Sequence, residues 1–286
     1  MADIQTALRA RAAELLTNGE VTMVIGWENG RFENQTTPFF ATTAAEAERL
    51  VFNDYCVNTV AKYAFKEFKI AAPDAKLAVC VRGCDSRGIN RMIRDNQLDR
   101  QRVYLLGVPC GGMHDRSGQL LEKCKNCTVK NPVIYDELLG EAVEESQPDR
   151  FEVVRRFEEM DREKRAEYFN EVFSRCIRCY ACREVCPVCT CRECFVDQHD
   201  VGWQGKQNNP NENRFYNLTR VFHVADRCIE CGECERACPM NLPLMAFNRK
   251  MVKDLDDLFQ AGEAGLDAAG SNAFGTYNLS DAEEFM

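Results

Sequence analysis

The first half of the chain alternates short apolar runs with amphipathic stretches, which is the pattern of an α/β domain. Residues 76–81 (KLAVCV) and 103–108 (VYLLGV) are continuous apolar runs, typical of strands buried in a parallel sheet. Between them a helix is expected to start at Asp85 or Ser86 and to end near residue 95. These segments predict a right-handed βαβ unit. Upstream, a helix is expected at 3–17, extended segments at 21–26 and 38–41, and helices at 44–53 and 58–68.

The second half shows helical periodicity instead. A charged helical stretch is expected over residues 149–175, and apolar stripes predict further helices at 212–225 and 244–260. From residue 262 the chain is acidic and rich in Gly and Ala. A flexible acidic tail is therefore expected over residues 262–286, either free or lying on a partner.

Cysteine spacing indicates the chemistry of the second half. Two runs have the form CxxCxxCxxxCP, which is the ferredoxin signature for two 4Fe–4S clusters. In such pairs each CxxCxxC supplies three thiolates to one cluster, and the cysteine before proline binds the other cluster. The first cluster is therefore assigned to Cys176, Cys179, Cys182 and Cys238, and the second to Cys228, Cys231, Cys234 and Cys186.

Structural zinc is the alternative for a cysteine-rich sequence, but zinc sites pair two CxxC units and do not need the CxxxCP crossover. Helical patterns around both runs favour the α-helical type of ferredoxin. The chain is thus predicted to combine an α/β domain with a small parallel sheet, residues 1–147, and an α-helical dicluster ferredoxin domain, residues 148–261.

A third group of cysteines is expected at the edge of the sheet. Cys84 and Cys110 follow the two buried strands, and parallel neighbours bring their carboxyl ends together. Cys124 and Cys127 add a CxxC shortly afterwards. A third 4Fe–4S cluster on these four thiols is the favoured interpretation, and a zinc knuckle or free buried thiols are the alternatives.

Five cysteines remain. Cys189, Cys191 and Cys194 lie within six residues, and two interpretations stay open: free thiols beside a cluster, or a further metal centre completed by one more ligand, for which Cys80 is the candidate. Cys56 and Cys80 otherwise read as small core residues. The histidines, His114, His199 and His223, are too scattered to define a site.

Composition narrows the class of protein. Seventeen cysteines without a secretory signal indicate reduced thiols and metal ligation, hence a cytoplasmic protein. The net charge of −9 argues against nucleic acid as a partner. No apolar stretch is long enough for direct membrane insertion. The sequence has neither a GxGxxG nor a GxxxxGK[ST] fingerprint, and no nucleophile–base pattern, so no catalytic residue is assigned.

Two stretches resemble known families. VRGCDSRGINRMIRDNQLDRQRVYLLGVPCGGM followed by KCKNC resembles the β subunits of coenzyme F(420)-reducing hydrogenases and formate dehydrogenases. FYNLTRVFHVADRCIECGECERACPMNLPL resembles the two-cluster module of heterodisulfide-reductase C-type subunits. The first resemblance implies that Cys84, Cys110, Cys124 and Cys127 hold a cluster near FAD, which splits a hydride into single electrons. The Gly-rich N-terminal segment that lines the flavin in family members is not found here.

Three functions follow as hypotheses. The first is an iron–sulfur subunit that relays single electrons within an anaerobic oxidoreductase complex. Its expected partners are a flavoprotein, a hydrogenase or formate dehydrogenase, or a heterodisulfide-reductase-like subunit. The second is a β subunit that carries FAD and itself oxidises or reduces a deazaflavin or NAD(P)H. The third is a zinc-stabilised assembly scaffold.

Overall fold

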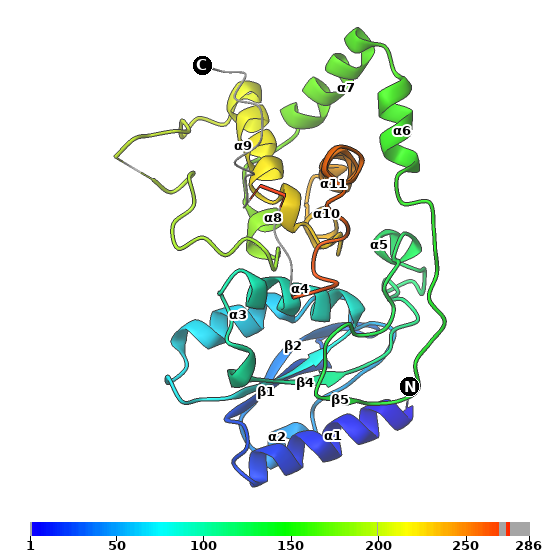
Figure 1. Cartoon of the computed structure of the whole chain (residues 1–286), viewed down its shortest axis with the longest axis vertical. Helices are drawn as coiled ribbons and strands as arrows, with labels where there is room; N and C mark the ends of the chain where they lie inside the picture. The colour runs from blue at the N-terminus through cyan, green and yellow to red at the C-terminus, as the bar shows by residue number, and fades with distance from the viewer. Residues whose placement is uncertain (1, 199, 269–272, 275–286) are drawn as a thin grey trace.

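The computed structural model of the chain describes residues 2–198, 200–268 and 273–274 (Figure 1). The expected βαβ unit is confirmed, because β3 and β4 pair in parallel on either side of α4. The elements of the first half are α1 (Ala2–Thr17), β1 (Met23–Asn29), β2 (Thr36–Ala41), α2 (Ala44–Ala47), α3 (Ala61–Ile70), β3 (Leu77–Val81), α4 (Gly83–Arg94), the 3-10 turn η1 (Arg100–Arg102), β4 (Val103–Gly107), α5 (Glu122–Lys125) and β5 (Glu137–Leu138).

The sheet has five strands in the order β2-β1-β3-β4-β5. The pairs β1–β3, β3–β4 and β4–β5 are parallel, whereas β2 runs antiparallel to β1. The prediction of a parallel sheet is therefore wrong at this edge, and the sheet is mixed. The reason is the short connection from residue 30 to residue 35, since a parallel neighbour would need a crossover of a dozen or more residues.

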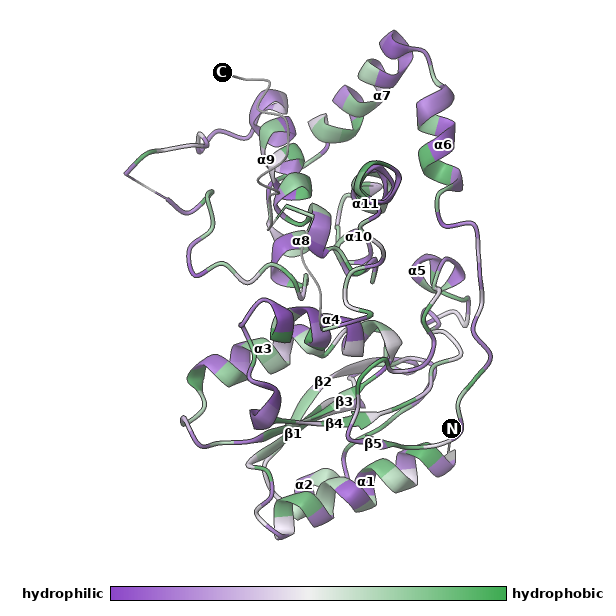
Figure 2. Cartoon of the chain, in the orientation of Figure 1, coloured by the Kyte–Doolittle hydropathy of each residue, from purple (hydrophilic) through white to green (hydrophobic). Residues whose placement is uncertain are grey.

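Helices cover both faces of the sheet (Figure 1). α1 and α2 lie against one face, and α3 and α4 lie against the other, toward the second half of the chain. All five residues of β3 are buried, and Trp27 of β1 and Leu8 of α1 belong to the same core. Figure 2 shows apolar residues along the central strands and on the helix surfaces that face them. Burial of each such side chain stabilises the fold by about 1.5–3 kcal/mol.

Two expected helix boundaries in the first half are wrong. The helix expected at 44–53 ends with α2, because Leu50, Val51 and Phe52 are all buried in succession and cannot share one helix face. The helix expected to be capped by Asp85 starts earlier, with Arg82 as N-cap. Asp85 instead lies one turn inside α4, where its carboxylate pairs with Arg82 at 2.7 Å.

The second half forms helices of very different length. They are α6 (Glu152–Glu159), α7 (Arg162–Ser174), α8 (Ala181–Glu184), α9 (Pro210–His223), the 3-10 turn η2 (Ala225–Arg227), α10 (Glu233–Arg236) and α11 (Leu244–Phe259). The single helix expected over 149–175 is divided at Met160. The break arises because Asp161 caps α7, its carboxylate accepting a hydrogen bond from the Lys164 amide at 2.9 Å.

The two halves meet along α4. A Cβ placed on Gly88 would contact Pro187 at 3.3 Å and Ile229 at 3.4 Å, so this helix packs directly on both cysteine-rich runs. The first residues of the expected tail also lie on α4: Arg87 donates to the Ala264 carbonyl at 2.8 Å, and Asn90 donates to the Gly265 carbonyl at 3.0 Å. Residues 269–272 and 275–286 of the expected tail lie outside the described residues. Among the described helices, none combines the length and apolar character that a membrane crossing requires.

Candidate iron–sulfur sites

The two CxxCxxC loops share one unusual backbone conformation. In each loop the residues on either side of the second cysteine have positive φ: Arg178 and Tyr180 in the first, Glu230 and Gly232 in the second. Left-handed residues within a turn direct successive backbone N–H groups inward, and such concavities bind anions, including iron–sulfur clusters. Each loop then enters a four-residue helix that contains the third cysteine. The two runs are therefore structural repeats suited to the same kind of guest.

The structure gathers the thiols predicted for the first cluster around one small cavity. These are Cys176, Cys179 and Cys182 from one run and Cys238 from the other. Two backbone amides already donate to sulfurs of this set: the Arg178 amide lies 3.4 Å from Cys176 Sγ and the Leu242 amide 3.5 Å from Cys238 Sγ. The Tyr216 hydroxyl lies at hydrogen-bond distance, 3.4 Å, from Cys182 Sγ. An all-thiolate donor set with backbone and hydroxyl donors fits a 4Fe–4S cluster.

The thiols predicted for the second cluster also lie together. Cys186 and Cys231 share a small apolar cluster with Ile229. Burial, followed by the negative charge of Cys186, raises the pKa of Cys231 well above its usual range. Burial also raises the pKa of Cys228 to about 12 and that of Cys234, with Cys186 adding to both shifts. Thiols in this state are neutral without metal and must release protons to bind it.

Arg220 of α9 is a buried cation between these two sets. It donates to the Cys182 carbonyl at 3.0 Å, and its charge interacts with Cys182, Cys186 and Cys234. The hydrogen bond from Cys189, and in addition the charge of Arg220, lowers the pKa of the Cys186 thiol below its usual range. A fixed positive charge at this place favours thiolates and electron-rich clusters on both sides.

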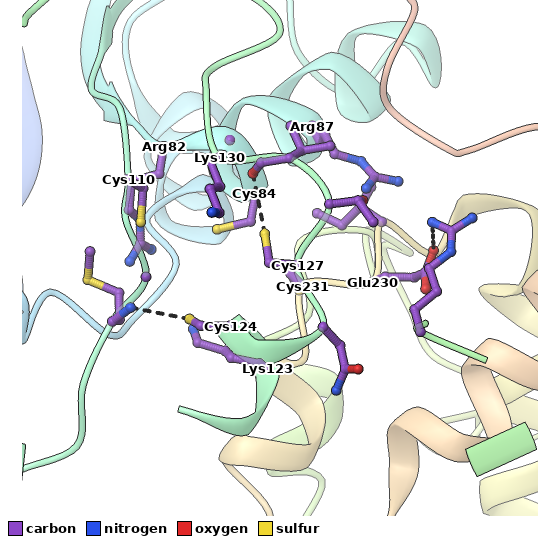
Figure 3. Close-up of a pocket in the computed structure, with 18 of the residues that line it drawn as sticks. Arg82, Cys84, Arg87, Cys110, Lys123, Cys124, Cys127, Lys130, Glu230 and Cys231 are labelled. Atoms are coloured by element: carbon purple, nitrogen blue, oxygen red, sulfur yellow. Dashed lines mark hydrogen bonds and ion pairs between the residues drawn. The ribbon is translucent and has the colours of Figure 1, made fainter. Parts of the chain in front are cut away.

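The third set of thiols lines a cavity of about 50 Å³ at the carboxyl edge of the sheet. Figure 3 shows Cys84, Cys110, Cys124 and Cys127 around one space, with Cys231 beside Cys127. Cys84 lies in the first turn of α4, and Cys110 follows β4, so the parallel pairing of β3 and β4 brings them together. Cys231, a residue of the second set, lines the same cavity. Its place there was not predicted, since no local pattern relates residue 231 to the sheet.

A buried ion pair holds the second and third sets against each other. Lys123, next to Cys124, pairs with Glu233, next to Cys234, and the two side chains are 7% and 2% exposed. Lys123 also donates to the Val57 carbonyl at 2.7 Å. Gly232 permits this approach, because a Cβ there would lie 2.4 Å from the Cβ of Lys123.

Cys189, Cys191 and Cys194 line a separate cavity, together with His223 at the end of α9. The proposal of Cys80 as a further ligand for these thiols is wrong. Cys80 lies on β3 and is wholly buried in the core of the sheet, where its side chain has no access to that cavity. Cys56 is likewise a core residue, as expected.

In the part of the chain that the structure describes, no three His, Cys, Asp or Glu side chains are gathered closely enough to hold a single metal ion. A cubane separates its four thiolates more widely than one ion does. The spacing of the cysteines in the first and third sets is therefore compatible with ligands to a cluster and not with ligands to a single ion.

Comparisons with known proteins agree with the predicted chemistry. Residues 172–242, which include every cysteine of the two runs, match the family described as 4Fe-4S dicluster domain. The chain is similar to F(420)-dependent formate dehydrogenase subunit beta of Methanocaldococcus jannaschii, with 23% identity over 88% of this chain and 90% of the relative. It is also similar to F(420)-dependent formate dehydrogenase 1 subunit beta of Methanococcus maripaludis, with 23% identity over 86% and 87% of the two chains. The predicted resemblance is confirmed.

Proposed function

We propose that this chain is an iron–sulfur electron-transfer subunit of a multi-subunit oxidoreductase. The observation that carries the proposal is the position of Cys231, which belongs to the second CxxCxxC loop and also lines the cavity of the third set. Neighbouring cluster sites allow single electrons to pass without long gaps. The dicluster domain and the similarity to formate dehydrogenase β subunits support the same function.

We assign three 4Fe–4S clusters to the chain. The first and second are bound across the two runs as the spacing predicts, and the third is bound at the edge of the sheet. The α/β part would end near residue 147 and the helical cluster part near residue 261. The ligands are Cys176, Cys179, Cys182 and Cys238; Cys228, Cys231, Cys234 and Cys186; and Cys84, Cys110, Cys124 and Cys127.

The protein contributes electrostatics and hydrogen bonds to this relay. When bound, the clusters accept and release one electron at a time. Tyr216 lies at hydrogen-bond distance from Cys182 Sγ, and Asn248 donates to Cys234 Sγ at 3.4 Å. Donors to sulfur and the buried charge of Arg220 stabilise the reduced, more negative state and so raise the reduction potential.

A partner would supply the hydride chemistry. Formate and deazaflavins react by hydride transfer, whereas cubanes take single electrons, so a flavin must stand between them. The alignment with the Methanocaldococcus relative extends over 350 positions, more than the 286 residues of this chain. The relative therefore has segments that this chain lacks. We place the flavin on a partner flavoprotein in the cytoplasm, within a complex of the formate dehydrogenase, hydrogenase or heterodisulfide-reductase kind.

The second candidate function is a β subunit that binds FAD and reacts with the hydride carrier itself. It is favoured by the names of both relatives, which are F(420)-dependent. The two functions differ in what the isolated chain can do. Only the second predicts bound FAD and oxidation of a hydride carrier without a partner.

The test is anaerobic purification of the whole chain, followed by quantification of iron, sulfide and flavin. The relay function predicts equal iron and sulfide, at least about 12 of each per chain for three cubanes. It also predicts reduction by dithionite and no oxidation of NAD(P)H or deazaflavin with viologen as acceptor. Iron-free, folded protein would contradict it. Turnover by the isolated chain with bound FAD would establish the second function instead.

A further inference from the structure

The cavity beside Cys189, Cys191 and Cys194 is large, with a volume of about 260 Å³, and none of the twelve cysteines assigned above lines it. A single metal ion would be enclosed by its own ligands and would not need such a space, which is many times the roughly 10–15 Å³ that one water occupies on the same measure. The three thiols belong to one short loop that follows Cys186. The cavity volume and the three thiols together indicate a polynuclear metal cluster as the ligand.

Cations from two different elements hold this loop in place. Lys62 of α3 donates to the Cys189 carbonyl. Arg227 of η2 donates to the Val188 carbonyl at 2.6 Å and to the Thr190 hydroxyl at 3.0 Å. These contacts brace both sides of Cys189. These contacts hold the backbone of the loop in place without a bound metal cluster.

The charge around the cavity is strongly positive. Its lining includes two carboxylates, Glu184 and Asp197, which pair with Lys66 and Arg183. Among the described residues, no carboxylate forms an ion pair with Lys62 or Arg220, although both are buried. The cations of the lining are Lys62, Lys66, Arg183, Arg192, Arg220 and Arg227. Buried cations of this kind call for an anionic guest, and a thiolate-bound iron–sulfur cluster is anionic.

We propose that this cavity binds a fourth 4Fe–4S cluster through the thiolates of Cys189, Cys191 and Cys194, with its fourth iron facing His223. The imidazole lines the same cavity, and its ring stands edge-on to Phe195, with centroids 5.2 Å apart. Among the described residues, no fourth cysteine lines the cavity, so a nitrogen ligand completes the site. This inference rests on the proposed electron-transfer function.

The site would be a point at which the relay reaches the surface. The Cys189 amide donates to the Cys186 carbonyl at 3.2 Å, which places the new cluster directly beside the second one. Cys191 is exposed. A single electron can therefore pass from the second cluster to the fourth and leave the protein there, with no bond formed or broken.

The test uses the full chain, purified anaerobically and reconstituted with ferrous iron and sulfide. We expect about 16 irons per wild-type chain, the content of four cubanes, and about 12 in Cys191→Ser. Cys80→Ala is the matched control, since it removes a cysteine outside every cluster site, and it should keep about 16. His223→Ala should keep the iron but change the electron paramagnetic resonance signal that Cys191→Ser removes. An unchanged signal would exclude His223 from the site.

If Cys191→Ser fails to fold, the wild-type chain alone still tests whether a fourth cluster is bound. Spin quantification after dithionite reduction should then show four clusters. A wild-type content of about 12 irons, equal to that of Cys191→Ser, would overturn the fourth cluster and leave the proposed function intact. A wild-type chain without iron would overturn the proposed function itself.

Discussion

The buried ion pair between Lys123 and Glu233 makes the contact between the two halves of the protein testable. Lys123→Met keeps the length and apolar stem of the side chain but removes its charge. Glu233 would then retain one cation, Arg236, whose guanidinium lies 2.8 Å from Oε2 and 3.0 Å from Oε1. The Thr59 amide would still donate to Oε2 at 3.4 Å. The Val57 carbonyl would lose its donor as well.

The magnitude follows from the charge that is left behind. Burial alone would raise the pKa of Glu233, yet Lys123 and Arg236 lower it to about 2. A net shift of this size corresponds to about 3 kcal/mol between the two protonation states. Removal of one partner from a buried ion pair costs about 3–5 kcal/mol when nothing replaces it. Because Arg236 remains, we expect a loss of about 2–3 kcal/mol, at or just below the lower limit of that range.

The assay is the rate at which the holoprotein loses its cluster absorbance in urea under anaerobic conditions. A rate is the suitable measure because loss of iron makes unfolding irreversible. Each factor of ten in a rate corresponds to about 1.4 kcal/mol. If the ion pair is already broken in the transition state for unfolding, a destabilisation of about 2–3 kcal/mol therefore makes the loss of cluster absorbance about 30- to 150-fold faster. The matched control is Lys125→Met, in the same short helix, whose ion pair with Glu122 is exposed. It should leave the rate within about twofold of wild type.

Two results would refute the reasoning. The first is a Lys123→Met protein that loses absorbance within about threefold of the wild-type rate, which would mean that the pair contributes little. The second concerns Lys123→Met combined with Glu233→Gln. The double variant should be more stable than Lys123→Met alone, because it no longer buries a poorly compensated charge. If it is less stable, the cost does not arise from the charge of Glu233.

The remaining predictions concern the clusters themselves. Cys182→Ala and Cys234→Ala should each lose iron and unfold the helical half, because ligation contributes folding free energy; full iron content and a native melting curve in either would contradict the assignment. Gly232→Ala should destabilise the protein and lower its iron content, since the added methyl meets Lys123 in a left-handed backbone position, whereas Gly118→Ala, which is also left-handed but has open space around it, should keep its iron. Arg220→Gln should lower the reduction potentials of the first two clusters by tens of millivolts in a redox titration, as expected for removal of one buried charge; potentials that do not move would show that Arg220 is only structural.

Local sequence determined the cluster motifs and much of the secondary structure of this protein. The CxxCxxC spacing places three thiols in one turn, and this holds whatever surrounds the loop. The continuous apolar runs of β3 and β4 can only be buried, and the segment between them is long enough for one helix. The convergence of Cys84 and Cys110 followed from these strands alone, because parallel neighbours end at the same edge of a sheet.

What the sequence left undecided depends on partners that are far apart along the chain. Residues 50–52 read as helix but are buried on all sides, and β2 pairs antiparallel because its connection is short. Lys123 and Glu233 are separated by 110 residues, and nothing in either neighbourhood predicts the other. The same holds for Arg220, which lies between the first and second sets of cysteines, and for His223, which lines one cavity with Cys189, Cys191 and Cys194. The spacing of cysteines along the chain determines which thiols of one loop lie together. The packing of the two halves determines which of these loops become neighbours and which charges lie between them.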